Sequence, residues 1–151
     1  MQIDFYQLSR DPAEVAVARI AAKALPAGQR MLVVAGDEAL LGRVSATLWG
    51  RVRESFLPNG MAGGEDDARQ PILLATDLAG GGAANGAGVV AFADGVWREM
   101  PEGGGGFARA LLFFDETGLM PARALWKVLG ERAGVTRAFW KQEDGRWVKA
   151  G

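Results

Sequence analysis

Cysteine and histidine are both absent from the 151-residue sequence. Without cysteine the chain has no disulfide bonds, no thiolate metal ligands and no thiol nucleophile. Without histidine it lacks the usual general base and the partner that activates a serine or cysteine nucleophile. Any catalysis would rest on carboxylates, lysine or arginine alone. These absences remove the usual catalytic groups and zinc ligands, and we expect no cofactor and no metal.

Long apolar runs are missing as well. No stretch approaches the roughly 18 to 20 apolar residues of a transmembrane helix, and residues 1–4 do not begin a basic segment followed by an apolar core. We expect a cytoplasmic protein that does not contact membranes. The length and the 49% hydrophobic content are those of one globular domain spanning residues 1–151.

Charge is nearly balanced overall but unevenly distributed. The formal net charge is −1, whereas from residue 119 onward seven cationic side chains stand against three acidic ones. That region therefore carries +4 and the rest of the chain −5. A basic region on a near-neutral protein indicates a local acidic partner rather than a surface that coats DNA. We expect any role at DNA to be indirect.

Periodicity predicts alternating strands and helices. Strand patterns cover 3–8, 31–35, 71–75, 89–92 and 108–114, and helix patterns cover 13–25, 37–49 and 119–133. Asp11 before Pro12 is a candidate N-cap for the first helix, and Asp37 for the second. With right-handed crossovers the pattern predicts a single-domain, three-layer, Rossmann-like α/β fold with a mostly parallel sheet.

The end of the chain predicts a β-hairpin. Two aromatic and basic runs, 138–142 and 146–149, flank Asp144-Gly145, a pair typical of tight turns. Exposed tryptophans interleaved with cations are able to stack nucleic-acid bases. Two short strands with one apolar face each also describe a lid packed on the sheet. Packing is the interpretation that we favour.

Two glycine-rich stretches, 80–88 and 103–106, are candidates for a phosphate-binding loop. The second is followed by a strand pattern rather than a helix, and neither precedes Gly-Lys-Ser/Thr. Connecting loops are the better interpretation. The acidic pairs at 66–67 and 115–116 similarly read as a solvated loop and a helix cap rather than a metal site.

The first candidate binding surface follows the second predicted helix. The core-facing stripe of that helix excludes Trp49, and Phe56 and Pro58 come shortly afterwards, with Arg51 and Arg53 between them. Aromatic residues beside arginines are typical of interface cores. The alternative is that Trp49 and Phe56 cap the end of an ordinary hydrophobic core.

The second candidate surface lies on the last predicted helix. A core-facing stripe of small and apolar residues is expected there, comprising Ala122, Leu125, Leu129 and Ala133. Arg123 and Lys127 project from a separate face, with Leu119 and Trp126 along its border. This arrangement suits a peptide that brings a carboxylate and an apolar side chain together. The alternative is a solvated helix face with Trp126 at the edge of the core.

Several short motifs, in order and over nearly the whole chain, resemble the chi subunit of bacterial DNA polymerase III. They are Asp4-Phe5-Tyr6-Gln7-Leu8, Leu48-Trp49, Glu54-Ser55-Phe56-Leu57-Pro58, Pro71-Ile72-Leu73-Leu74, Arg123-Ala124-Leu125-Trp126-Lys127 and Trp140-Lys141. The resemblance implies a non-catalytic replication adaptor of the clamp loader, monomeric before it enters a complex. The alternative from another class is a nucleotide- or small-molecule-binding domain that uses the glycine-rich loops.

The resemblance also implies two partners. Arg123 and Trp126 align with the pocket that holds the C-terminal tail of single-stranded DNA-binding protein, an acidic tail ending in phenylalanine. A basic residue often found one turn earlier is Leu119 here, so Lys127 or Arg132 would have to supply that charge. The cluster of Trp49, Phe56 and Pro58 matches the surface for a psi-like clamp-loader subunit or a competing helicase.

Overall fold

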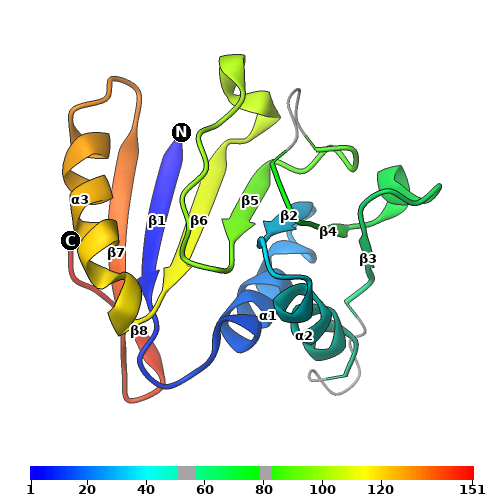
Figure 1. Ribbon diagram of the computed structural model, residues 1–151, viewed down its shortest axis with the longest axis horizontal. Helices are drawn as coiled ribbons and strands as arrows, with labels where there is room; N and C mark the ends of the chain where they lie inside the picture. The colour runs from blue at the N-terminus through cyan, green and yellow to red at the C-terminus, as the bar shows by residue number, and fades with distance from the viewer. Residues whose placement is uncertain (51–56, 79–82) are drawn as a thin grey trace.

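The computed structural model describes residues 1–50, 57–78 and 83–151, whose strands form one eight-stranded sheet (Figure 1). The strands are β1 (Gln2–Gln7), β2 (Met31–Val34), β3 (Asn59–Met61), β4 (Ile72–Ala75), β5 (Val89–Phe92), β6 (Arg109–Phe114), β7 (Thr136–Glu143) and β8 (Arg146–Lys149). The helices are α1 (Ala13–Ala24), α2 (Glu38–Gly50) and α3 (Leu119–Gly130), with short 3-10 helices η1 (Asp67–Arg69), η2 (Glu102–Gly106) and η3 (Glu116–Gly118).

The sheet is parallel except at its last pair. Its spatial order is β3-β4-β2-β5-β6-β1-β7-β8, and only β7 and β8 run antiparallel among the described strands. β1 lies between β6 and β7, so that Tyr6 is opposite both Phe113 and Trp140. The predicted mostly parallel α/β fold with a C-terminal hairpin is confirmed.

Helices and loops cover the two sides of this sheet. We call the side against which α1 and α2 pack the first face, and the side against which α3 packs the second face. Figure 1 shows α3 beside β7 and β1 at one end of the sheet, and α2 near β3 and β4 at the other. These elements make the three layers that the sequence predicts.

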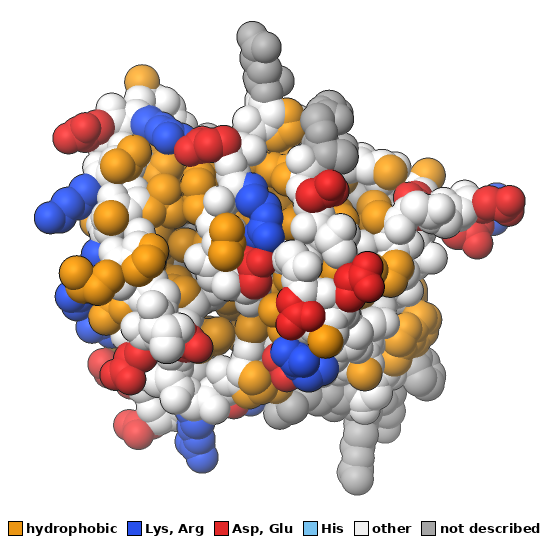
Figure 2. Space-filling model, viewed as in Figure 1, with side chains coloured by type: hydrophobic (Ala, Val, Ile, Leu, Met, Phe, Trp, Pro, Cys, Tyr) orange, Lys and Arg blue, Asp and Glu red, His pale blue; other side chains and the backbone are white. Residues whose placement is uncertain are grey.

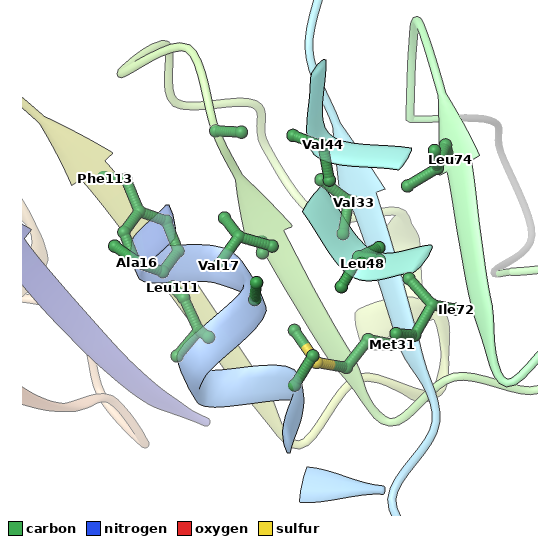
Figure 3. Close-up of a cluster of buried hydrophobic side chains, with 14 of the residues drawn as sticks. Ala16, Val17, Met31, Val33, Val44, Leu48, Ile72, Leu74, Leu111 and Phe113 are labelled. Carbon is green, nitrogen blue, oxygen red and sulfur yellow. The ribbon is translucent and has the colours of Figure 1, made fainter. Parts of the chain in front are cut away.

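Side-chain alternation along buried strands builds a core on each face. In β2, Met31 and Val33 pack towards the helices of the first face, whereas Leu32 and Val34 belong to the second-face core. Val44 and Leu48 of α2 are fully buried over β2 and β4 (Figure 3). The predicted helix stripe is therefore the one that is buried.

The strict alternation of strands and helices is wrong in the middle of the chain. The described residues between β4, β5 and β6 contain loops and the 3-10 helix η2 in place of an α-helix. Apolar loop residues cover the second face there instead, namely Trp97, Met100 and Phe107. The short edge strand β3 was not predicted, because a strand of three residues is too short to show alternation. Its first residue, Asn59, is held in place by polar contacts. Ser45 Oγ donates to Asn59 Oδ1 at 2.6 Å.

Two predicted helix limits need correction. Asp11 does not cap α1, because its carboxylate instead accepts hydrogen bonds from Arg19 Nη1 at 2.7 Å and from Gln142 Nε2 at 3.0 Å. Asp37 does cap α2, accepting from the Ala39 N–H at 2.9 Å. α3 ends at Gly130, where the chain turns towards β7, so Ala133 lies beyond the helix and is exposed.

The hairpin turns at Asp144 and Gly145, both with positive φ, as the Asp-Gly pair predicts. β7 pairs in parallel with β1 along Gln2–Gln7, so the hairpin extends the sheet and does not lie over it as a lid. The alternative of a lid is therefore wrong in its geometry. Packing of the tryptophans is confirmed, since Trp140 and Trp147 rest against the first-face core.

Candidate functional site

A groove of about 820 Å³ lies on the second face between α3, β7 and the residues after β8. Its lining combines apolar, aromatic and cationic residues. The lining residues are Gln7, Met120, Arg123, Ala124, Trp126, Lys127, Val128, Phe139, Lys141, Ala150 and Gly151. Three of the four residues predicted for the tail site, Arg123, Trp126 and Lys127, therefore line one groove.

Aromatic rings form the apolar part of the groove. Trp126 and Phe139 are half-buried, and their ring centroids are 5.7 Å apart in an edge-to-face arrangement. Phe5 supports both rings from the core, at 5.3 Å from Trp126 and 5.9 Å from Phe139. Met120 and Val128 are 72% and 51% exposed at the margins. An apolar side chain of a ligand would find a rigid ring wall there.

Arg137 fixes the orientation of Trp126. Its guanidinium carbon lies 4.0 Å from the centroid of the indole, and Nη1 donates a hydrogen bond to the Trp126 carbonyl oxygen. Gly130 leaves the space that this guanidinium occupies, because a Cβ there would lie 2.6 Å from the Arg137 Cζ. A strand residue and a helix glycine thus hold the central ring of the groove.

Three cations surround the aromatic wall. Arg123, Lys127 and Lys141 are exposed, and none forms an ion pair with another described residue. Arg132, the other candidate for the charge missing at Leu119, is already held by Glu99 through two hydrogen bonds of 2.8 and 2.9 Å. Those bonds from Arg132, opposed weakly by burial, lower the pKa of Glu99.

Sequence reasoning missed the contribution of β7. Phe139 and Lys141 reach the groove because alternate residues of a strand share one face, and β7 pairs with β1 beside α3. The alternation of side chains along β7 can be read from the sequence, but the position of α3 over β7 cannot. Leu119 is placed differently from its predicted partners: it packs against the second-face core and does not line the groove.

The other candidate surface lies at the far edge of the sheet. Trp49 at the end of α2 is 44% exposed and Pro58 is exposed, while Phe56 lies outside the described residues, as do Arg51 and Arg53. The Leu57 N–H donates to the Leu48 carbonyl oxygen at 3.2 Å, so the chain returns beside the helix end. Met61 of the edge strand β3 is 47% exposed nearby in the chain.

Figure 2 shows hydrophobic and cationic side chains interleaved over α3, at the left of that view. Acidic side chains are also visible near both ends of α3, and a further group lies over the loops between the central strands. The lining itself contains the cations Arg123, Lys127 and Lys141 and no acidic residue, so the groove is locally basic in a protein whose net charge is −1.

A second cavity, of about 600 Å³, lies at the carboxyl ends of the central strands. β1 leads to α1 on the first face and β6 leads to α3 on the second, and ligands of open α/β sheets bind at such switch points. Five carboxylates line it, however: Asp11, Glu14, Asp37, Asp94 and Asp115. This composition disfavours the phosphates of a nucleotide.

Each of these carboxylates has an internal task. Asp94 pairs with Arg98 at 2.8 Å, and although burial opposes the effect, hydrogen bonds from Arg98, Gly36 and Val96 lower its pKa. Asp115 accepts from the Thr117 N–H at 2.9 Å and caps η3. The described residues contain no group of three acidic side chains placed to hold a metal ion. Nor is any of their helices long and apolar enough to cross a membrane.

No curated protein matches the chain. A sequence profile of the family described as DNA polymerase III chi subunit, HolC, matches residues 1–136, which end at the first residue of β7.

Proposed function

Since the chain belongs to the DNA polymerase III chi subunit (HolC) family, and is thus an accessory subunit of that polymerase, we propose that it binds the C-terminal tail of single-stranded DNA-binding protein in the groove between α3 and β7. It acts as an adaptor and performs no chemistry of its own. The tail supplies carboxylates and a terminal phenylalanine, and the groove offers cations around a ring wall.

The observation that carries this proposal is the convergence of Arg123, Lys127 and Lys141, without an ion pair to another described residue, on Trp126 and Phe139. Cations already held by internal carboxylates would add little to peptide binding. Charge-assisted hydrogen bonds are each worth about 1.5 to 3 kcal/mol, and an aromatic side chain is a frequent binding anchor. Lys141 supplies the positive charge that Leu119 does not.

A second partner, a psi-like clamp-loader subunit or a helicase, binds at the opposite edge of the sheet through Trp49, Phe56 and Pro58. The 44% exposure of Trp49 supports this surface, because a core cap would be buried. Exposed tryptophan at the end of a helix is the kind of residue on which binding energy concentrates. The adaptor thereby joins the clamp loader to protein-coated single-stranded DNA.

The test of the groove is calorimetry with an acidic peptide that ends in phenylalanine. Arg123→Ala should weaken binding by roughly 10- to 150-fold, the equivalent of one charge-assisted contact. Arg69→Ala is the matched control, since its side chain is 87% exposed on η1, away from the groove. Equal affinity of the Arg123 variant and the wild-type protein would remove the groove as the tail site.

The same peptide separates this function from nucleotide binding. η2 with its glycines leads into the amino end of β6 rather than into a helix, and the carboxyl-edge cavity is acidic. In a thermal-shift experiment nucleotides should leave the melting temperature unchanged, whereas the peptide should raise it by mass action. A rise with nucleotides alone would favour the other function.

A further inference from the structure

A third cavity, of about 320 Å³, opens on the first face beside α1. α1 borders this part of the sheet on one side, and the hairpin of β7 and β8 borders it on the other. The lining residues are Tyr6, Ile20, Lys23, Ala24, Gln29, Arg109, Trp140 and Trp147. None of them is acidic, in contrast to the cavity at the carboxyl edge.

Three aromatic rings line the cavity in a fixed arrangement. Tyr6 and Trp140 have nearly parallel rings, with an interplanar angle of 13° and centroids 6.4 Å apart. Trp147 meets Tyr6 edge to face at 5.0 Å. Tyr6 is buried, whereas both tryptophans keep part of their surface exposed. The two indoles are therefore the rings that a planar ligand can reach.

A polar network at the base of the cavity holds these rings. Arg109 Nε donates to Asp4 Oδ2 at 2.6 Å, and its Nη2 donates to the Tyr6 hydroxyl at 2.9 Å. Trp140 Nε1 lies 3.4 Å from Asp4 Oδ1. Burial, partly offset by Arg109, raises the pKa of Tyr6 to about 12, so the hydroxyl stays neutral. The Arg109 guanidinium compensates the charge of Asp4 inside the protein.

Cations stand at the rim. Lys23 is exposed on α1, and Lys149 is directly opposite Trp140 in the antiparallel pair, which places both residues on the first face. Neither lysine forms an ion pair with another described residue. Partly exposed indoles near lysines that have no ion pair to a described residue match a ligand that has both a flat π-face and negative charge.

We propose that this cavity binds single-stranded nucleic acid, with a base stacked against Trp140 or Trp147 and the neighbouring phosphates contacted by Lys23 and Lys149. Stacking on aromatic side chains with cations along the backbone is how proteins hold single strands without sequence preference. A duplex keeps its base faces covered and does not fit. The site lies on the opposite side of β7 from the peptide groove and is independent of the proposed function.

Two phosphate contacts make binding weak and dependent on salt. For a single strand each contact contributes about −0.7 to the slope of log K against log salt, so a slope of about −1.4 is expected. The measurement is fluorescence anisotropy of a labelled oligothymidylate with the full chain at low salt. A duplex of the same length should bind at least about fivefold more weakly, since it offers no base to stack.

Charge reversal on two surfaces tests the location. Lys23→Glu and Lys149→Glu should each weaken oligothymidylate binding by at least about fivefold and leave tail-peptide affinity unchanged. Lys127→Glu, the same change in the peptide groove, should weaken tail-peptide binding and leave oligothymidylate affinity unchanged. Trp147→Phe should reduce the quenching of tryptophan fluorescence by the oligonucleotide, whereas Trp126→Phe should not.

Three results would overturn the proposal. One is the absence of oligothymidylate binding at low salt. Another is equal weakening by Lys127→Glu and Lys23→Glu, which would indicate diffuse electrostatic attraction. The third is equal affinity for duplex and single strand. Tail-peptide affinity measured on the same variants reports separately on the groove, so failure of one site does not count against the other.

Discussion

Arg137 and Gly130 do not line the groove, yet they determine how its central ring, Trp126, is held. The guanidinium covers one face of the Trp126 indole, and it does so only because residue 130 has no Cβ. The clash in a Gly130→Ala variant would be with the end of a flexible side chain rather than with backbone. The arginine is therefore the group that would move.

We predict that Gly130→Ala alters the groove without unfolding the protein. Alanine favours helix by up to about 1 kcal/mol over glycine, so the melting temperature should stay level or rise, while tail-peptide affinity falls as Trp126 loses its support. Calorimetry and tryptophan fluorescence measure the effect. Gly42→Ala in α2, where a Cβ meets nothing within 4 Å, is the control and should leave affinity unchanged. Unaltered peptide affinity in the Gly130 variant would show that Arg137 is not needed.

Asp94 gives a prediction on pH. Its carboxylate accepts from Arg98, Gly36 and Val96 and thereby ties the loop after β5 to the end of β2. Because its pKa in the folded state is below the usual 3.8, the carboxylate stabilises the fold above that pH, and the contribution is lost as pH falls through the lower folded value.

Asp94→Asn should therefore lower the free energy of unfolding at neutral pH by about 1.5 to 3 kcal/mol, the loss of hydrogen bonds to a charged group. The difference between variant and wild type should shrink as pH falls below 3.8. Urea unfolding at a series of pH values measures both. A difference that stays constant through that range would show that the carboxylate charge is not the stabilising feature.

Elements could be predicted from the sequence where a regular periodicity extends over many residues and depends only on residues near in the chain. The stripe of α2 and the spacing of Arg123, Trp126 and Lys127 on α3 follow from about 100° per residue. Lys141 could not be assigned, because its neighbours come from a helix whose position over β7 no local pattern contains. β3 was missed for a related reason, since its partner β4 rather than its own sequence defines it.

The alternation of β7 and β8 leads to a prediction at the level of the hairpin. Lys141 lies on the second face and Lys149 on the first, although both belong to the same small element. Lys141→Ala should weaken tail-peptide binding by about 10-fold or more, and Lys149→Ala should not. Titration of one peptide into both variants decides the matter. Equal loss in both would mean that the hairpin acts through its total charge rather than its faces.

At the scale of the whole molecule, the two proposed protein-binding surfaces lie at opposite ends of the sheet. The helix α2, which contains Trp49, lies near the β3 edge, whereas α3, which contains Arg123 and Trp126, lies beside β7 and β1 near the other edge (Figure 1). No element is shared between them, so substitutions should act independently. We therefore predict that the protein holds both proposed partners at once.

Trp49→Ala should reduce clamp-loader partner binding by roughly 2 kcal/mol or more, as expected of a hot-spot tryptophan, with tail-peptide affinity unchanged and little change in melting temperature. In the double variant with Arg123→Ala, the affinity for each partner should fall by the same factor as in the corresponding single variant. Phe56→Ala offers the same test: a large drop in melting temperature, reflecting about 3 to 5 kcal/mol, would assign that ring to the core instead.

The position of β1 between β6 and β7 also limits the order in which the sheet can assemble. Gln2 pairs with Arg109 on one side and with Thr136 on the other. Neither side of β1 can therefore form its ladder hydrogen bonds before the last third of the chain has been synthesised. Until then its apolar residues and unpaired backbone groups remain open to other chains. β2 and β4 have their partners much sooner. We therefore expect that the half of the sheet that carries the proposed clamp-loader surface can form during translation, whereas the proposed peptide groove, which needs β7, forms only once the last third of the chain is available.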